Sequence, residues 1–285
     1  MLAAIEAGGT KFVLATGPSP DTMTARHTIP TRDPATTLAE AAQWLAAQGT
    51  ITAIGIGSFG PVELDPGSDR WGFITNTPKP GWADCDIAGY FRTRLGVLVG
   101  FDTDVNAAAL AEYRAAETAG CRSLAYLTIG TGIGAGLVLN GVPVHGVAHP
   151  EMGHIYPRRH PLDRDFAGVC PHHGDCLEGL ASGPAIMARW GVSLSQLPQD
   201  HPGHAIIADY IAQACHVLFA AVAVERIVIG GGVAKTAELM ECIMARTAEL
   251  GAGYLPGTAR HRIHGPQCGE DAGISGAMML AQTAR

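Results

Sequence analysis

Four potential metal ligands lie close together in the middle of the chain. They are His154, Cys170, His173 and Cys176, and the last three follow the pattern Cys-x2-His-x2-Cys. Thiolate and imidazole groups are preferred ligands of Zn²⁺ and disfavour Mg²⁺ and Ca²⁺. His172 is an alternative to His173, but its spacing to the two cysteines is uneven. Because protein would fill all four positions, segment 154–176 predicts a closed, structural zinc site.

Three acidic side chains stand at positions where a carboxylate could do chemistry. Glu151 and Glu178 each lie within three residues of a predicted zinc ligand. Asp104 ends an apolar run and begins an alanine-rich one, so we expect it where a strand meets a helix. A carboxylate there is either a helix N-cap or a general base. Asp102 and Asn106 form a polar cluster around it, which a cap alone does not require.

Three glycine-rich turns could cradle phosphate groups. Glycine lets backbone N–H groups approach an anion closely, while threonine adds a hydroxyl and lysine a cation. None of the turns has the P-loop pattern, and the second runs into a strand-like stretch, which excludes a dinucleotide fingerprint. The alternative for each is a tight turn without a ligand. The residues concerned are Gly8, Gly9, Thr10, Lys11, then Gly130, Thr131, Gly132, and finally Gly231 and Gly232.

Strand and helix patterns alternate along the chain, which is typical of a mixed α/β fold. We expect strands at 2–7, 11–17, 53–58, 97–104, 124–129, 136–139 and 226–229. We expect helices at 34–48, 105–118, 177–190 with a break near Gly183, 204–224, 236–250 and 272–284. The hairpin at residue 2 is echoed by one at residue 124, which favours two domains. The first would comprise 1–115 plus 271–285, and the second 116–270 with the zinc-binding segment 154–176.

Bulk properties exclude several classes of protein. Hydrophobic residues make up 47% of the 285 and charged residues 16%, which argues against disorder. The net charge is −7 without a basic stripe, so no nucleic-acid partner is expected. No unbroken apolar stretch reaches the length of a membrane span. The seven cysteines are dispersed outside the cluster, which favours a reducing cytoplasm over a disulfide framework.

Several motifs together resemble the ROK (repressor, ORF, kinase) family of sugar kinases from end to end. They are E-A-G-G-T-K, D-T-D-V-N-A-A-A, I-G-T-G-I-G-A-G, E-M-G-H, C-P-H-H-G-D-C-L-E-G-L-A-S-G and I-G-G-G-V. The long cysteine-containing motif is most similar to the zinc-containing fructokinases of bacteria. The resemblance implies a two-domain α/β fold of the actin-like ATPase (ribonuclease H-like) type with an interdomain cleft. It also implies phosphorylation of a hexose by ATP and Mg²⁺, with structural Zn²⁺ in place.

The resemblance also assigns roles to individual residues. It implies that Asp104 is the catalytic base and that Asn76, Asn106, Glu151, His154 and Glu178 line the sugar pocket. The first two glycine turns would hold phosphates, and Gly231 and Gly232 would lie against adenosine. The family usually has Asn-Asp where this chain has Thr103-Asp104. One sugar contact made by that asparagine is therefore in doubt.

The expected reaction is conversion of D-fructose to fructose 6-phosphate. The near alternatives are a glucokinase, a mannokinase or an N-acetylhexosamine kinase of the same family. The alternative of another class is a non-catalytic sugar-binding sensor. Loss of Asp104 or of the glycine turns would favour a sensor, and the sequence retains both. The implied partners are the sugar, ATP and a second copy of the chain.

Overall fold

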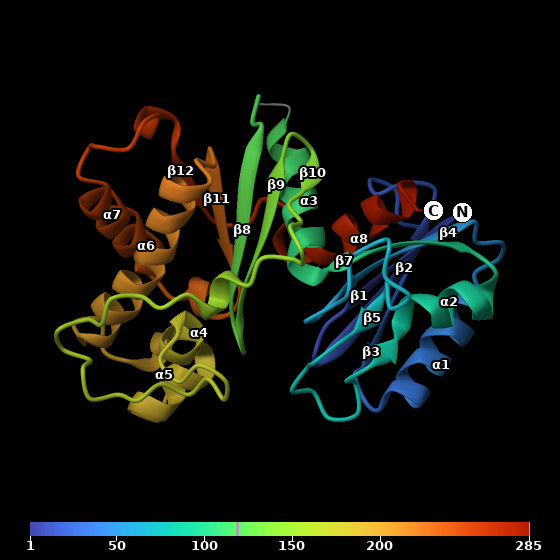
Figure 1. Cartoon of the computed structure of the whole chain (residues 1–285), viewed down its shortest axis with the longest axis horizontal. Helices are drawn as coiled ribbons and strands as arrows, with labels where there is room; N and C mark the ends of the chain where they lie inside the picture. The colour runs from blue at the N-terminus through green and yellow to red at the C-terminus, as the bar shows by residue number, and fades with distance from the viewer. Residues whose placement is uncertain (118–119, 285) are drawn as a thin grey trace. The chain divides into compact units, whose positions relative to one another are not determined.

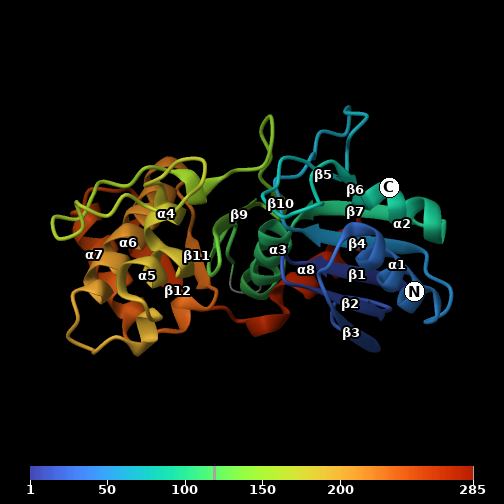
Figure 2. The same cartoon turned by 90° about the horizontal axis from the view of Figure 1, so that it is seen from below.

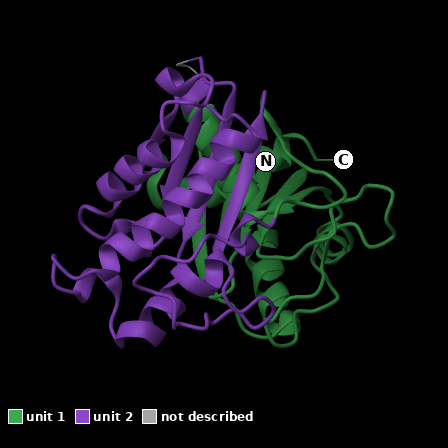
Figure 3. Cartoon of the chain, turned by 60° about the vertical axis from the view of Figure 1, so that its left-hand side comes forward, with its two compact units in different colours: residues 1–115, 141–150, 268–285 green, residues 116–140, 151–267 purple. Residues whose placement is uncertain are grey.

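The computed structural model describes residues 1–117 and 120–284, which divide into two compact α/β units (Figure 3). Unit 1 consists of Met1–Ala115, Gly141–Pro150 and Cys268–Arg285, and unit 2 of Ala116–Asn140 and Glu151–Gln267. Segment 141–150, which the sequence analysis placed in the second domain, therefore clusters with unit 1. Thr118, the last residue of the helix expected at 105–118, and Arg285, the last residue of the first expected domain, lie outside the described residues.

The sheet of unit 1 begins with a hairpin and continues with parallel strands. Its strand order is β3-β2-β1-β4-β7. Strand β1 is antiparallel to β2 and parallel to β4, which is in turn parallel to β7. The bounds are β1 (Leu2–Ala7), β2 (Lys11–Gly17), β3 (Ala25–Pro30), β4 (Ala53–Ser58) and β7 (Leu98–Thr103), with a separate pair β5 (Phe73–Ile74) and β6 (Cys85–Asp86).

Helices cover both faces of this sheet (Figures 1 and 2). They are α1 (Pro34–Ala46), α2 (Ile87–Leu95), α3 (Asp104–Glu117) and α8 (Ala272–Gln282). Because side chains alternate along a strand, Ile5 joins the core beneath α1 and α2, while Ala4 packs against Ile274 of α8. Helix α1 starts where Asp33 accepts a hydrogen bond from the backbone N–H of Thr36. Apolar side chains therefore pack on both faces of the unit 1 sheet and fix the positions of its strand ends.

Unit 2 repeats the same strand pattern. Its strands run in the order β9-β8-β11-β12, with β8 antiparallel to β9 and β11 parallel to both β8 and β12. The bounds are β8 (Ser123–Ile129), β9 (Ile133–Leu139), β11 (Arg226–Gly230) and β12 (Arg262–His264); β10 (Val142–Pro143) lies in segment 141–150. A hairpin followed by parallel strands thus opens both units, as the sequence echo predicts.

The helices of unit 2 are α4 (Leu177–Ala181), α5 (Gly183–Trp190), α6 (Gly203–Ala221) and α7 (Leu239–Gly251). Short 3-10 turns are η1 (Met152–His154), η2 (Leu194–Gln196), η3 (Val233–Lys235) and η4 (Thr258–Arg260), and η5 (Gly269–Asp271) belongs to unit 1. Helices α6 and α7 lie side by side (Figures 1 and 2). Among the described residues α6 is apolar and long enough to cross a membrane, but 61% of its most apolar window is buried. A core helix has the same composition, so this is weak evidence for a span.

Ser182 divides the helix expected over 177–190. Its backbone is extended (φ −70°, ψ 164°), and it ends α4 and precedes α5. The hydroxyl accepts a hydrogen bond from the backbone N–H of Ala185, which caps α5, and Pro184 occupies the first turn where no backbone donor is needed. The break expected near Gly183 therefore exists, and serine is the residue that makes it.

Candidate functional site

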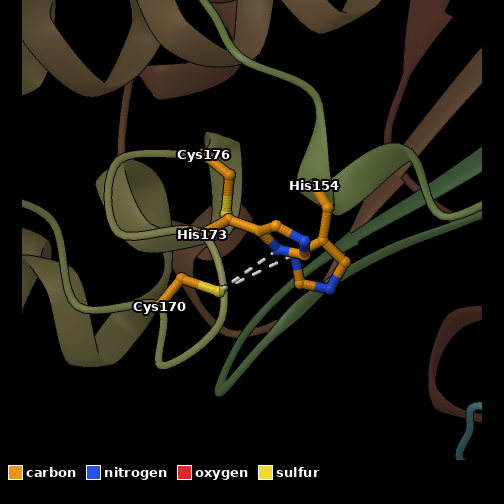
Figure 4. Close-up of side chains that lie close together, drawn as sticks. All are labelled: His154, Cys170, His173 and Cys176. Atoms are coloured by element: carbon orange, nitrogen blue, oxygen red, sulfur yellow. Dashed lines mark hydrogen bonds between the residues drawn. The ribbon is translucent and has the colours of Figure 1, made fainter.

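The four predicted zinc ligands meet at one point in unit 2 (Figure 4). Turn η1 supplies His154, and the loop before α4 supplies the other three. One ligand atom from each lies within 4.8 Å of all the others. Cys170 and Cys176 are buried, while His173 is exposed. The four residues predicted from their spacing in the sequence are therefore close together in the folded chain.

The distances in this cluster fit a tetrahedral zinc ion. His154 Nδ1 lies 3.5 Å from Cys176 Sγ and 3.8 Å from Cys170 Sγ, and His173 Nδ1 lies 3.8 Å from Cys170 Sγ. Bonds of about 2.3 Å to sulfur and about 2.0 Å to nitrogen at tetrahedral angles separate such atoms by about 3.6 Å. Burial raises the pKa of the Cys176 thiol to about 11, so a bound divalent cation must displace its proton.

Three of the predicted sugar-binding residues converge on the start of β9. Glu178 accepts a hydrogen bond from the backbone N–H of Ile133 at 3.0 Å. Turn η1 packs on the same residue so closely that a Cβ at Gly153 would stand 1.8 Å from the Ile133 carbonyl oxygen. Only glycine fits there, which explains its place between Glu151 and His154. His154 Nε2 lies 4.0 Å from Glu151 Oε2, so the ring can use Nδ1 for metal and Nε2 toward the polar side.

The second and third glycine turns share a cavity of about 520 Å³ in unit 2. Gly130, Thr131 and Gly232 lie on its wall. Gly231 adopts φ 93°, and a Cβ there would stand 2.3 Å from the Ile129 carbonyl oxygen. The rest of the wall carries no phosphate-binding pattern and could not be predicted from the sequence. It consists of Gly183, Pro184, Ile186, Met187, Ser193, Leu194, Ser195, Val233 and Thr236. The size and mostly apolar wall suit a small organic ligand.

The first glycine turn closes the β1–β2 hairpin of unit 1. The backbone N–H of Gly8 donates to the carbonyl of Lys11 at 3.0 Å, and Lys79 Nζ donates to the carbonyl of Gly9. Gly9, Thr10 and Lys11 are exposed. Nearby, burial raises the pKa of Glu6, a residue that the site prediction omitted. The turn therefore combines exposed backbone with two nearby lysines, which is compatible with binding of an anion.

Asp104 is partly buried where β7 ends and α3 begins. The capping bond of α3 is made by its neighbour, because Thr103 Oγ accepts from the backbone N–H of Asn106 at 3.0 Å. Asp104 Oδ1 accepts a local hydrogen bond from the backbone N–H of Val105, at 2.8 Å. Of the two roles open to Asp104 from sequence, the cap thus belongs to Thr103.

Asp102, which the sequence placed in the polar cluster around Asp104, pairs with His145, and this pairing was not predicted from the sequence. Asp102 is 2% exposed, and its carboxylate accepts bonds from Asn106 Nδ2 at 2.7 Å and the Thr103 N–H at 2.7 Å. His145 Nε2 lies 3.0 Å from the other oxygen, Oδ2. The hydrogen bond to Asp102 raises the pKa of His145. The amide of Asn106 is thereby fixed in orientation beside Asp104.

We expect the NMR titration of His145 to give a pKa above the ordinary value of about 6.5, and Asp102→Asn to lower it. The raised pKa means that the charged interaction is fully present below the unfolded value and is lost as pH rises through the folded value. Stability lost in Asp102→Asn should therefore be largest at mildly acid pH. An unshifted His145 in the unmodified protein would contradict this pairing.

Asn76 lies in unit 1, in the turn after β5, and is exposed. Its neighbour Thr75 is fixed by bonds from its N–H and hydroxyl to the carbonyl of Pro61, at 2.8 Å and 3.1 Å. The backbone next to Asn76 is therefore fixed by hydrogen bonds, and the role of Asn76 in sugar binding stays a prediction.

The hairpin-and-parallel-strand pattern in both units, with glycine turns at the strand ends, defines an α/β protein of the actin-like ATPase (ribonuclease H-like) fold. The ROK family model matches residues 2–284, and the chain belongs to that family. It is 43% identical to a fructokinase from Zymomonas mobilis, over 98% of this chain and 96% of that protein. It is 44% identical to a putative fructokinase from Bacillus subtilis, over 100% and 96%. Among solved structures, a ROK hexokinase from Thermus thermophilus superimposes with a TM-score of 0.80 at 26% identity, covering 99% of this chain and 98% of that one.

Proposed function

We propose that the protein is an ATP-dependent fructokinase, which converts D-fructose to fructose 6-phosphate. The observation that carries this proposal is Asp104, a carboxylate at a strand–helix junction whose capping role Thr103 has taken. End-to-end identity of 43% with a fructokinase and of 44% with a putative fructokinase supports the choice of sugar. Fold alone would not, because one fold serves many reactions.

The proposed reaction needs a base, because the attacking hydroxyl of the sugar must lose its proton as its oxygen bonds to the γ-phosphorus of ATP. Asp104 accepts that proton, and the bond to ADP breaks on the opposite side of the phosphorus. Asn106, held by Asp102, offers its amide to a neighbouring hydroxyl. Charge on the phosphate oxygens would be neutralised by Mg²⁺ bound with the nucleotide.

In unit 2, sugar recognition is assigned to Glu151, His154 and Glu178. In unit 1, Asn76 and Asn106 are proposed as sugar-binding residues. Carboxylate, imidazole and amide groups discriminate between sugars because a buried polar group left without a partner is penalised. The Cys/His cluster fits this role as a support, since His154 and Cys176 belong to it and Glu178 follows Cys176 by two residues.

The nucleotide is assigned to the 520 Å³ cavity. The turn at Gly130, Thr131 and Gly132 would contact phosphates, and Gly231 and Gly232 would lie against adenosine. Gly8, Gly9, Thr10 and Lys11 are proposed as a further phosphate contact in unit 1, where backbone donors and a cation are exposed. By resemblance to the family, we also propose that the enzyme is a cytoplasmic homodimer.

Glu178→Gln should raise the KM for fructose by roughly tenfold to a hundredfold, which is the loss of a charge-assisted hydrogen bond. Glutamine keeps an oxygen that can accept from the Ile133 N–H, so the turn should remain folded. The matched control is Glu249→Gln, at an exposed ion pair with Arg246 on α7. Steady-state kinetics with fructose varied at saturating ATP measures the effect, and equal KM values in the two variants would remove Glu178 from the sugar site.

The proposed function is tested by ADP release with ATP and Mg²⁺ against fructose, glucose, mannose and N-acetylglucosamine. Strongest turnover with fructose supports the proposal. Preference for another hexose keeps the phosphoryl transfer and replaces the sugar by a glucokinase, mannokinase or N-acetylhexosamine kinase activity. No turnover, together with measurable sugar binding in folded protein, favours a sugar-binding sensor.

A further inference from the structure

A buried ion pair links the zinc-site loop to helix α5 in unit 2. Arg189 donates from Nε and Nη2 to the two carboxylate oxygens of Asp163, at 2.9 Å and 2.8 Å. The side chains are 4% and 6% exposed. The hydroxyl of Tyr210 on α6 donates to Asp163 at 2.7 Å, so both oxygens of the carboxylate are engaged. Such a fork-to-fork contact fixes direction as well as distance.

The two residues belong to segments with different tasks. Asp163 lies in the loop between the zinc ligands His154 and Cys170. The aromatic ring of Phe166 in that loop lies 3.8 Å from the guanidinium carbon of Arg189. Arg189 itself stands in the last turn of α5 and also donates to the carbonyl of Ala185. The loop therefore contacts the end of α5 through an ion pair and a cation–π interaction, both with Arg189.

The other end of α5 is fixed to the glycine turn. The backbone N–H of Gly183 donates to the carbonyl of Gly130 at 2.7 Å. Between these two attachments, Ile186 and Met187 lie on the wall of the 520 Å³ cavity. The helix thus forms a wall that is held at one end by the glycine turn and at the other by the zinc-site loop.

We propose that Arg189 is a positioning residue for the nucleotide cavity, which acts through Asp163 to hold α5 in register with the zinc-ordered loop. The nucleotide part of the proposal rests on the proposed function. Arg189 touches no substrate in this proposal; it sets the placement of Ile186 and Met187. Lysine cannot replace it, since an ammonium group lacks the planar fork that meets both carboxylate oxygens.

The test uses the full-length zinc-loaded protein with three variants and one control. Arg189→Lys keeps the charge and removes the fork. Arg189→Met removes the bidentate charged partner of Asp163 and leaves only the more distant guanidinium of Arg159, 4.0 Å from Oδ2, among the described ion pairs. Asp163→Asn with Arg189→Met removes both charges, so stability should partly recover while the link stays broken. The control is Arg246→Met, which breaks an Arg–Asp pair between α7 and α6 that makes no bond to α5.

The direct readout is the Kd for ATP and for fructose, each measured by calorimetry, with zinc content and melting temperature for every variant. We expect the Kd for ATP to rise about tenfold, or about 1.4 kcal/mol, in all three variants. The Kd for fructose and the zinc content should stay near those of the unmodified protein. An unchanged Kd for ATP in the double variant overturns the proposal, as does an equal rise in Arg246→Met.

Hydrogen exchange of the α5 amides gives a second readout that needs no ligand. Faster exchange over 185–190 is expected in the double variant and in chelator-treated protein. If the unmodified protein binds no ATP, the proposed function fails, and exchange alone decides whether the loop orders α5. Unchanged exchange in both samples overturns the link itself.

Discussion

Replacement of Asp104 by asparagine is expected to lower kcat for fructose phosphorylation by roughly 10²–10⁴. Asparagine has the same shape, and its carbonyl oxygen can still accept from the N–H of Val105. The helix start should also survive, because its cap is Thr103. The loss therefore reports the missing proton acceptor, and Asp104→Ala should show at least as large an effect. Single-turnover kinetics, with zinc content and melting temperature alongside, measures it.

Asp86→Asn is the matched control for this variant. Asp86 is also an acidic residue at a helix start in unit 1, where it caps α2 by accepting from the N–H of Gly89 at 2.7 Å. Asparagine is an equally good cap, so stability and kcat should both be retained. A kcat for Asp104→Asn close to that of Asp86→Asn would mean that another group accepts the proton.

Central strands and local clusters were predictable from the sequence because their signals are local. Strands β1, β2 and β4 begin and end where their patterns predict. The four potential zinc ligands could be grouped from the sequence because three of them share one short loop. The edge strands β3 and β12 were not predicted from the sequence. Strand β3 is mostly exposed and lacks an apolar run, and β12 is short and is recognised as a strand only by its pairing with β11. Helix α2 carried a usable signal, since Asp86 caps its start and Gly96 ends it at φ 66°.

Polar pairs distant in sequence could not be predicted in this way. Asp102 and His145 are 43 positions apart, and Asp163 and Arg189 are 26 apart. Neither pair has a spacing that a helix or strand would impose, so the partners become visible only once the elements are packed. The placement of Ser193 and Ser195 on the cavity wall is of the same kind. Sequence spacing therefore predicts functional residues that lie within one segment. The residues that fix such a segment in place are found only in the folded structure.

The purified protein is expected to contain about one zinc ion per chain, and loss of that ion should cost it a large part of the stability of unit 2. Structural zinc contributes on the order of 10 kcal/mol to folding of such sites. Cys176→Ser should lower zinc content, make segment 155–175 sensitive to protease, and raise the KM for fructose, because Glu178 follows two residues later. Metal analysis before any exposure to chelator, limited proteolysis and kinetics give the three measurements.

The matched control is Cys242→Ser, at an exposed cysteine on α7 that lies outside the ligand cluster. It should keep the zinc, the protease resistance and the KM. Acid should mimic Cys176→Ser, since protonation of the thiolates and imidazoles releases the metal, and zinc added back at neutral pH should restore both resistance and KM. Protein that is fully active and protease-resistant without zinc would show that the four side chains hold the loop by themselves. A protein that keeps its zinc in Cys176→Ser would instead point to His172 as a replacement ligand.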